Sequence, residues 1–186
     1  MDQEKTQQFE DEIKRLYFEN FDDNLMSFWN VHLKPVIDIA KKLAVKYEAD
    51  LEIVWLAAVL HDIGQFDDIE NHDTVGSEKA YKILFERGYS EEIAAKVRDV
   101  ILTHRVKSYL PETLEQKIVA TADAMAHFTT AHYVWMAYIS KKPFAELMKK
   151  FSGKIQRDFQ DKIFFEEERE IMRPQYEMLK KWFEIV

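Results

Sequence analysis

Apolar residues recur every three to four positions along almost the whole chain, and this spacing is the period of an α-helix. The sequence of 186 residues contains only four glycines and four prolines, too few for the many tight turns of a β-rich fold. No internal repeat and no convincing strand pattern interrupts the helical spacing. The pattern therefore predicts an all-α protein.

The predicted helices begin and end at residues that commonly cap helices. Asp50 and Ser90 are expected as N-caps, and either Asp73 or Thr74 is expected to cap a third helix. Gly64 is expected to help end one helix and Gly88 another. The expected helices cover Glu4 to Asn20, Met26 to Tyr47 with a kink or a shifted start at Pro35, Leu51 to His61, Asp73 or Thr74 to Arg87, Ser90 to His104, Leu114 to Ile139, and one or two helices from Pro143 onwards, interrupted near Gly153 or Pro174.

Length and charge narrow the class of protein. A chain of this length is expected to form one domain over residues 1–186. Its net charge of −8 argues against a broad nucleic-acid or anionic-membrane surface, because such surfaces are basic, and leaves room for a small basic pocket. The absence of cysteine fits a reducing compartment, and the longest clean apolar run, IVWLAAVL, is too short to span a bilayer. We therefore expect a cytoplasmic protein without a nucleic-acid or membrane partner.

Histidines and acids stand at the edges of the predicted core. The apolar run WLAAVL ends in His61-Asp62, His32 lies on the apolar face of the preceding helix, and Asp123 interrupts an apolar helix. A buried carboxylate is costly unless it is compensated. A divalent ion can bind imidazole nitrogens and carboxylate oxygens together, so these four residues are predicted metal ligands. Adjacent residues such as His61 and Asp62 can share one ion only if the helix ends there.

The order His32, His61-Asp62, Asp123 resembles that of the HD-domain superfamily of metal-dependent phosphohydrolases. The flanking segments HDIG, HDTVGSEKA, VILTH and IVATADA strengthen the resemblance, which covers residues 28–128. It implies a compact multi-helix bundle over these residues, and residues 140–186, outside the resemblance, are expected to form additional C-terminal helices. It also implies one or two divalent ions, of Mn, Fe, Co, Ni, Mg or Zn, with His72 and His104 as ligands of a second ion and Asp62 as the bridging carboxylate.

Further residues receive roles from their positions beside these ligands. Asp62, His72 and His104 are predicted to be catalytic, and Gln65, Arg105 and Lys107 are predicted to bind substrate. A guanidinium group suits phosphate oxygens, although Arg105 and Lys107 also fit a solvated helix end. His127 lies four residues beyond Asp123 and is predicted to support the site, whereas His132 is predicted to be structural. The aromatic residues Phe128, Tyr133, Trp135 and Tyr138 are assigned to the core or to a homodimer interface.

The resulting hypothesis is hydrolysis of a phosphoester or phosphoanhydride bond by a metal-activated water, with a nucleotide or another small phosphorylated compound as substrate. The HD-GYP group usually has lysine after HDIG, whereas this chain has Gln65 and lacks the GYP motif, which lowers the case for cyclic-dinucleotide hydrolysis. The same ligand order resembles the HD-type di-iron oxygenases, which activate O₂. A non-catalytic module that senses a nucleotide through its metal is the third hypothesis.

Overall fold

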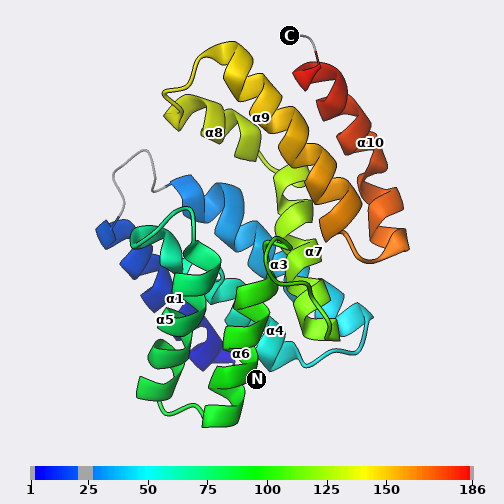
Figure 1. Ribbon diagram of the computed structural model, residues 1–186. Helices are drawn as coiled ribbons and strands as arrows, with labels where there is room; N and C mark the ends of the chain where they lie inside the picture. Colours follow the sequence, from blue (N-terminus) through cyan, green and yellow to red (C-terminus); the bar gives the residue numbers. More distant parts are fainter. Residues whose placement is uncertain (1–2, 21–26, 185–186) are drawn as a thin grey trace.

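The computed structural model describes residues 3–20 and 27–184, and these residues contain helices and no strand (Figure 1). The predicted all-α class is confirmed. The helices are α1 (Gln3–Asn20), α3 (Lys34–Lys46), α4 (Leu51–Leu60), α5 (His72–Glu86), α6 (Glu91–Thr103), α7 (Leu114–Thr129), α8 (His132–Ile139), α9 (Phe144–Arg157) and α10 (Glu166–Phe183), joined in places by the short turns η1 (Trp29–Leu33), η2 (Ile63–Phe66) and η3 (Asp158–Lys162).

Two predicted N-caps are confirmed and one is wrong. The Asp50 carboxylate accepts hydrogen bonds from the N–H groups of Glu52 and Ile53, and the Ser90 hydroxyl accepts one from Ile93. Asp73, however, lies inside the first turn of α5, which begins at His72. The carboxylate of Asp73 instead accepts a hydrogen bond from Arg105, so a long-range partner replaces the predicted cap.

Pro35 shifts the start of α3, as predicted. The predicted beginning at Met26 lies outside the described residues, and the chain forms a π turn over Trp29–Leu33 before the α-helix begins at Lys34. Proline has no N–H group to donate to the carbonyl four residues earlier, which is that of Val31. The hydroxyl of Thr130 donates to this carbonyl at 2.7 Å. The turn before Pro35 is thus tied to the end of α7.

The single helix predicted from Leu114 to Ile139 is wrong, because Thr130 interrupts it. Thr130 has an extended backbone, and its hydroxyl accepts a hydrogen bond from the N–H group of His132 at the start of α8. This local bond competes with helix continuation, as threonine hydroxyls often do. Of the aromatic residues in this region, Phe128 and Tyr133 are buried, whereas Tyr138 is exposed.

The predicted interruption of the C-terminal region is also misplaced. Gly153 lies inside α9 and Pro174 inside α10, both exposed, and the break falls at residues 163–165 between η3 and α10. Thr121 on α7 fixes this break: its hydroxyl donates to the carbonyl of Lys162 at 3.2 Å and accepts from the N–H group of Phe164 at 3.1 Å. A tertiary contact therefore decides where the chain turns.

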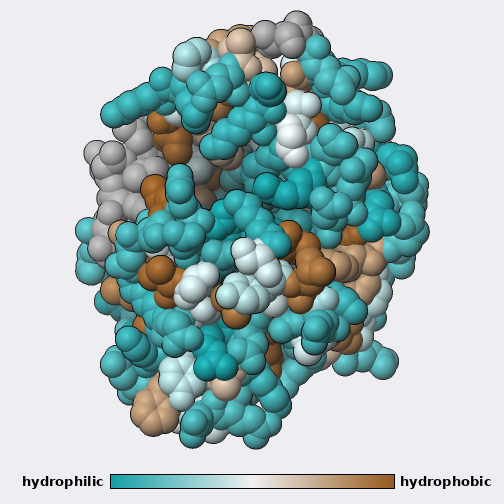
Figure 2. Space-filling model, viewed as in Figure 1, coloured by the Kyte–Doolittle hydropathy of each residue, from teal (hydrophilic) through white to brown (hydrophobic). Residues whose placement is uncertain are grey.

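Helices α3 and α7 pack against each other in the middle of the molecule. Figure 1 shows α1, α4, α5 and α6 gathered towards one end of the molecule and α8, α9 and α10 towards the other, with α7 passing between the two groups. The face seen in Figure 2 is mostly hydrophilic, with hydrophobic side chains in separate patches. No described helix combines the length and the apolar character needed to cross a membrane.

Gly64 is required by close packing rather than by the end of a helix. It lies in η2 against the first turns of α5, and a Cβ at this position would lie 2.6 Å from the amide nitrogen of Gly76. Backbone atoms cannot move aside as a flexible side chain can. This contact holds the segment that follows His61-Asp62 against the helix that begins with His72.

Gly64→Ala is therefore expected to lower the free energy of unfolding by at least about 2 kcal/mol, because the added methyl group forces the two backbones apart. Gly153→Ala is the matched control, since a Cβ there meets nothing within 4 Å on an exposed helical turn. That substitution is expected to raise the free energy of unfolding by about 0.5–1 kcal/mol. Urea unfolding followed by circular dichroism measures both, and equal effects would contradict the packing argument.

Candidate metal centre

Three segments bring the predicted ligands of the first ion together. The Nε2 atom of His32 lies 3.2 Å from Oδ2 of Asp62 and 3.3 Å from Oδ1 of Asp123. The Nε2 atom of His61 lies 3.3 Å from the same Asp62 oxygen and 3.2 Å from Nε2 of His32. His61 and Asp62 can both face this point because α4 ends at Leu60 and the backbone changes direction at Asp62.

The other oxygen of Asp62 faces a second group of ligand atoms. His72 at the start of α5 places Nε2 3.1 Å from Oδ1 of Asp62, and His104 at the end of α6 places Nε2 3.8 Å from it. The nitrogen and oxygen atoms of this trio lie within 4.8 Å of one another. The structure therefore groups the other five predicted metal ligands around Asp62, which turns one carboxylate oxygen towards each group.

The donor chemistry of both groups fits a divalent ion. The Nδ1 atoms of His61, His72 and His104 lie 2.9, 2.7 and 2.6 Å from the backbone carbonyls of Ala58, Ile69 and Ile101. A carbonyl only accepts, so these Nδ1 atoms carry hydrogen, and in its neutral form each imidazole would turn the lone pair of Nε2 towards Asp62. Lone pairs facing a carboxylate repel it unless a cation or a proton lies between them.

The separations within the first group also fit one coordination sphere. Ligand atoms about 2.1 Å from an ion lie roughly 3.0 Å apart at octahedral angles and roughly 3.4 Å apart at tetrahedral angles. The four separations of 3.2–3.3 Å within the first group fall between these values.

Burial and charge together set the protonation of the ligands. Burial alone would lower the pKa of His61, but the charges of Asp62 and Asp123 and the hydrogen bond with Asp62 outweigh it and raise this pKa to about 9. Burial would likewise raise the pKa of Asp62, but its imidazole partners hold it well below the ordinary value. Burial and the nearby charge of His61 lower the pKa of His104. Without metal, one proton is thus retained at His61.

Lys162 neutralises part of Asp123 and was missed by the sequence analysis. Its Nζ atom is buried and forms an ion pair with Oδ2 of Asp123, which leaves Oδ1 to face His32. The two hydrogen bonds of Thr121 at residues 162 and 164 hold this lysine in place. Nothing in the sequence marks Lys162, which is one of several lysines in an amphipathic C-terminal region.

His127 and His132 also line the centre. The Nδ1 atom of His127 lies 2.9 Å from Oδ2 of Asp158, and its Nε2 atom lies 3.4 Å from Oδ1 of Asp123. This arrangement agrees with the predicted supporting role of His127. Asp158 is fully buried and was also missed, because it belongs to a segment without any histidine. His132, predicted to be structural, is buried and lines the pocket beside the centre.

The predicted substrate-binding residues line a pocket of about 750 Å³ together with the metal ligands His32, Asp62, His72, His104 and Asp123. Gln65, Arg105 and Lys107 all belong to its wall. Arg105 donates to the Asp73 carboxylate at 3.1 Å and to the backbone carbonyl of Glu70, so part of its guanidinium group is already engaged.

Comparisons with known proteins agree with this arrangement. The HD domain family model matches residues 31–127. The chain is 42% identical over 110 residues to the uncharacterized protein MJ0778 of Methanocaldococcus jannaschii, covering 50% of this chain and 62% of that protein. It is 33% identical over 113 residues to the Bacillus subtilis protein named "Putative phosphohydrolase YueE", covering 50% of this chain and 63% of that protein. The chain thus spans less than two thirds of either relative.

The fold also resembles that of a solved structure. The crystal structure of Bacillus subtilis YpgQ superimposes with a TM-score of 0.68 at 20% sequence identity, covering 96% of this chain and 93% of that chain. Because the identity is low, this likeness concerns the fold alone.

Purified protein is expected to bind two divalent ions per chain, as counted by metal analysis after dialysis against Mn²⁺. His72→Ala should lower the count to one, because it removes a ligand of the second group only, whereas Asp62→Asn should abolish tight binding at both. Glu78→Gln, on the exposed face of α5, is the control and should leave two ions bound. A count of two in the Asp62 variant would contradict the shared carboxylate.

Metal binding is also expected to strengthen with pH. The folded-state pKa of His61, about 9, lies above the ordinary value of 6.5, so the proton stabilises the metal-free protein at low pH and is lost as pH rises through 9. An ion needs the neutral imidazole and must displace this proton. Calorimetric titration should show the affinity for Mn²⁺ rising about tenfold per pH unit between about pH 7 and pH 9, with about one proton released. A flat profile would contradict the protonation assigned to His61.

Proposed function

The chain belongs to the HD-domain family, and from this premise we propose that it is a metal-dependent phosphohydrolase acting on a nucleotide or another small phosphorylated compound. The observation that carries the proposal is Asp62, whose two oxygens face two groups of ligand atoms beside an open pocket. A pair of ions that shares one carboxylate suits hydrolysis at phosphorus, because it can bind the entering and the leaving oxygen together. The name of the Bacillus subtilis relative supports the same reaction class.

Water is the attacking group in this proposal. No described residue that lines the pocket is Ser, Thr, Tyr or Cys, so its wall offers no hydroxyl or thiol nucleophile. Divalent ions, when bound by the two ligand groups, supply charge that polarises a phosphate and lowers the pKa of water. Asp62, His72 and His104 form the second group and would hold the second ion. Hydrogen bonds from Nδ1 to backbone carbonyls keep both imidazoles in the orientation that metal binding needs.

An apolar part of the pocket wall suits a flat organic group such as a nucleobase. Phe28, Trp135, Met136 and Ile139 line it, and the rings of Phe28 and Trp135 lie 5.2 Å apart. Apolar and aromatic side chains bind such groups by burial and stacking. These side chains line the same pocket as residues that suit phosphate, and the ring of Phe28 stacks on that of His32 at 5.0 Å, which supports a nucleotide as the substrate.

The test is a substrate screen on protein loaded separately with Mn²⁺, Fe²⁺, Co²⁺, Ni²⁺, Mg²⁺ or Zn²⁺. Phosphate or pyrophosphate release is expected from nucleotides, and Asp62→Asn should lower turnover at least about a thousandfold because it disrupts both ligand groups. Glu78→Gln should retain wild-type turnover.

Two outcomes would replace the proposal. Oxygen consumption by iron-loaded protein, without any release of phosphate, would favour the di-iron oxygenase hypothesis. Nucleotide binding with every metal but without turnover would favour a non-catalytic module.

A further inference from the structure

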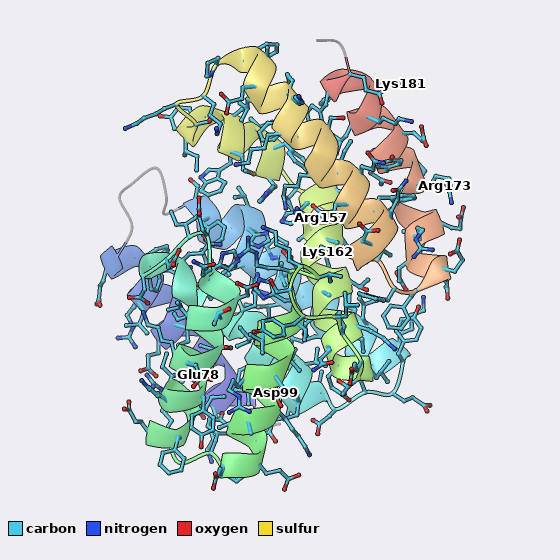
Figure 3. The ribbon with its side chains drawn as sticks, viewed as in Figure 1. Glu78, Asp99, Arg157, Lys162, Arg173 and Lys181 are labelled. Atoms are coloured by element: carbon cyan, nitrogen blue, oxygen red, sulfur yellow. The ribbon has the colours of Figure 1, made fainter. Side chains whose placement is uncertain are left out.

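The pocket has a cationic wall that the metal centre does not explain. Lys150, Lys154 and Arg157 occur at positions i, i+4 and i+7 of α9 and all line the pocket, as does Lys149. Lys107 joins them from the segment between α6 and α7. We refer to these five residues as the α9 wall. Figure 3 shows Arg157 and Lys162 on the inner side of the C-terminal helices, beside the nitrogen-rich centre of the molecule.

The charge of the pocket opposes the charge of the chain. The described residues that line it include seven Lys and Arg but only two acids, the metal ligands Asp62 and Asp123. Subtracting these from the 26 basic and 34 acidic residues of the chain leaves 19 basic and 32 acidic residues elsewhere. Lysines scattered at random over an acidic surface would not produce such a contrast. The cations are concentrated where a ligand would bind.

Most of the α9 wall lacks a protein counter-ion. Among the described residues, Lys107, Lys149 and Lys150 form no ion pair. The buried Nε atom of Arg157 has no hydrogen-bond partner there, and its Nη2 atom lies 3.7 Å from Asp158. Lys154 and Arg157 therefore share Asp158 as a counter-ion, with Nζ of Lys154 3.1 Å from its Oδ2 atom. Several N–H donors therefore remain free to bind an anion.

The two sides of the wall lie close enough to repel each other. Burial, the charges of Arg105 and Arg157, and that of Lys154 lower the pKa of Lys107, with Asp73 opposing them only in part. Asp158 pairs only with Lys154 and Arg157, so the cations of the wall outnumber the nearby acids, and a bound anion relieves the remaining repulsion. Lys107, Lys149 and Lys150 are exposed, but they line the same pocket as Lys154 and Arg157 and so form one cationic surface with them.

We propose that the α9 wall binds the phosphoryl groups of the substrate that are not cleaved, so that the pocket selects compounds with two or more linked phosphoryl groups. This inference rests on the proposed function for the position of the cleaved group. A single phosphate at the metal centre would leave the outer cations Lys149 and Lys150 unpaired. A di- or triphosphate chain carries enough charge to engage both the centre and the wall.

Calorimetric titration of the full chain with excess Mn²⁺ tests the inference. The probes are methylenediphosphonate, which carries two linked phosphonate groups and resists hydrolysis, and methylphosphonate, which carries one. Methylenediphosphonate should bind at least tenfold more tightly. The variant Lys150→Gln/Arg157→Gln should lose at least tenfold of that affinity while methylphosphonate affinity changes less than threefold. Lys107→Gln, on the opposite side, should weaken methylenediphosphonate alone.

The matched control removes two positive charges far from the pocket, in Lys42→Gln/Lys181→Gln, and should leave both affinities within twofold of the wild type. Equal losses in the control and the wall variant, or equal affinity of wild type and wall variant for methylenediphosphonate, would overturn the inference. Because binding is read without turnover, a protein that binds the probe as expected but hydrolyses no phosphorylated compound refutes the proposed function and leaves the anion-binding wall in place.

Discussion

The buried carboxylate of Asp62 is the constraint on which the rest of the structure depends. A carboxylate removed from water must be compensated by charge or hydrogen bonds, and Asp62 is surrounded by imidazoles from η1, α4, α5 and α6. Because three of these imidazoles donate at Nδ1 to backbone carbonyls, their Nε2 atoms compensate Asp62 only where a second proton or a cation lies between them and the carboxylate. The proton retained at His61 provides this compensation in the metal-free protein, and divalent ions would provide it in the loaded one. The ends of α4 and α6 and the start of α5 are thus held together by whatever positive charge compensates Asp62, a proton or a divalent ion.

The residues that sequence analysis located are those whose chemistry is unusual for their surroundings. His61-Asp62 at the end of an apolar run, His32 on an apolar face and Asp123 in an apolar helix each contradict the pattern around them, and the structure brings all four together. The N-caps Asp50 and Ser90 were also predictable, because capping depends on residues within the first turn of the same helix. Lys162 and Asp158 were not, since a charged residue in an amphipathic helix is ordinary and only tertiary packing reveals that these two are buried. The role of Gly64 likewise depends on contacts with residues further along the chain, and the break at Thr130 combines a local bond to His132 with a distant one to Val31.

Ligand binding and pocket shape come from different parts of the chain. The family match, residues 31–127, contains all six predicted metal ligands, whereas α8, α9 and η3 supply most of the apolar wall, most of the α9 wall and Lys162. The matches to the two curated relatives cover only half of this chain. A shared metal centre therefore implies a shared reaction class more strongly than a shared substrate, because the groups that would distinguish substrates lie largely outside the common region.

Asp158 physically connects these two parts. Its carboxylate accepts a hydrogen bond from His127, which faces Asp123 in the metal centre, and forms an ion pair with Lys154 of the α9 wall. A fully buried acid held by one partner from each side fixes their relative position, since moving either would leave a charge unpaired in the interior. The distance between the metal centre and the cations is thus set by a buried ion network and not by the exposed loops. If both surfaces bind anions as proposed, a pocket of fixed span would distinguish ligands by the spacing of their charges, which an acidic protein cannot do by net attraction.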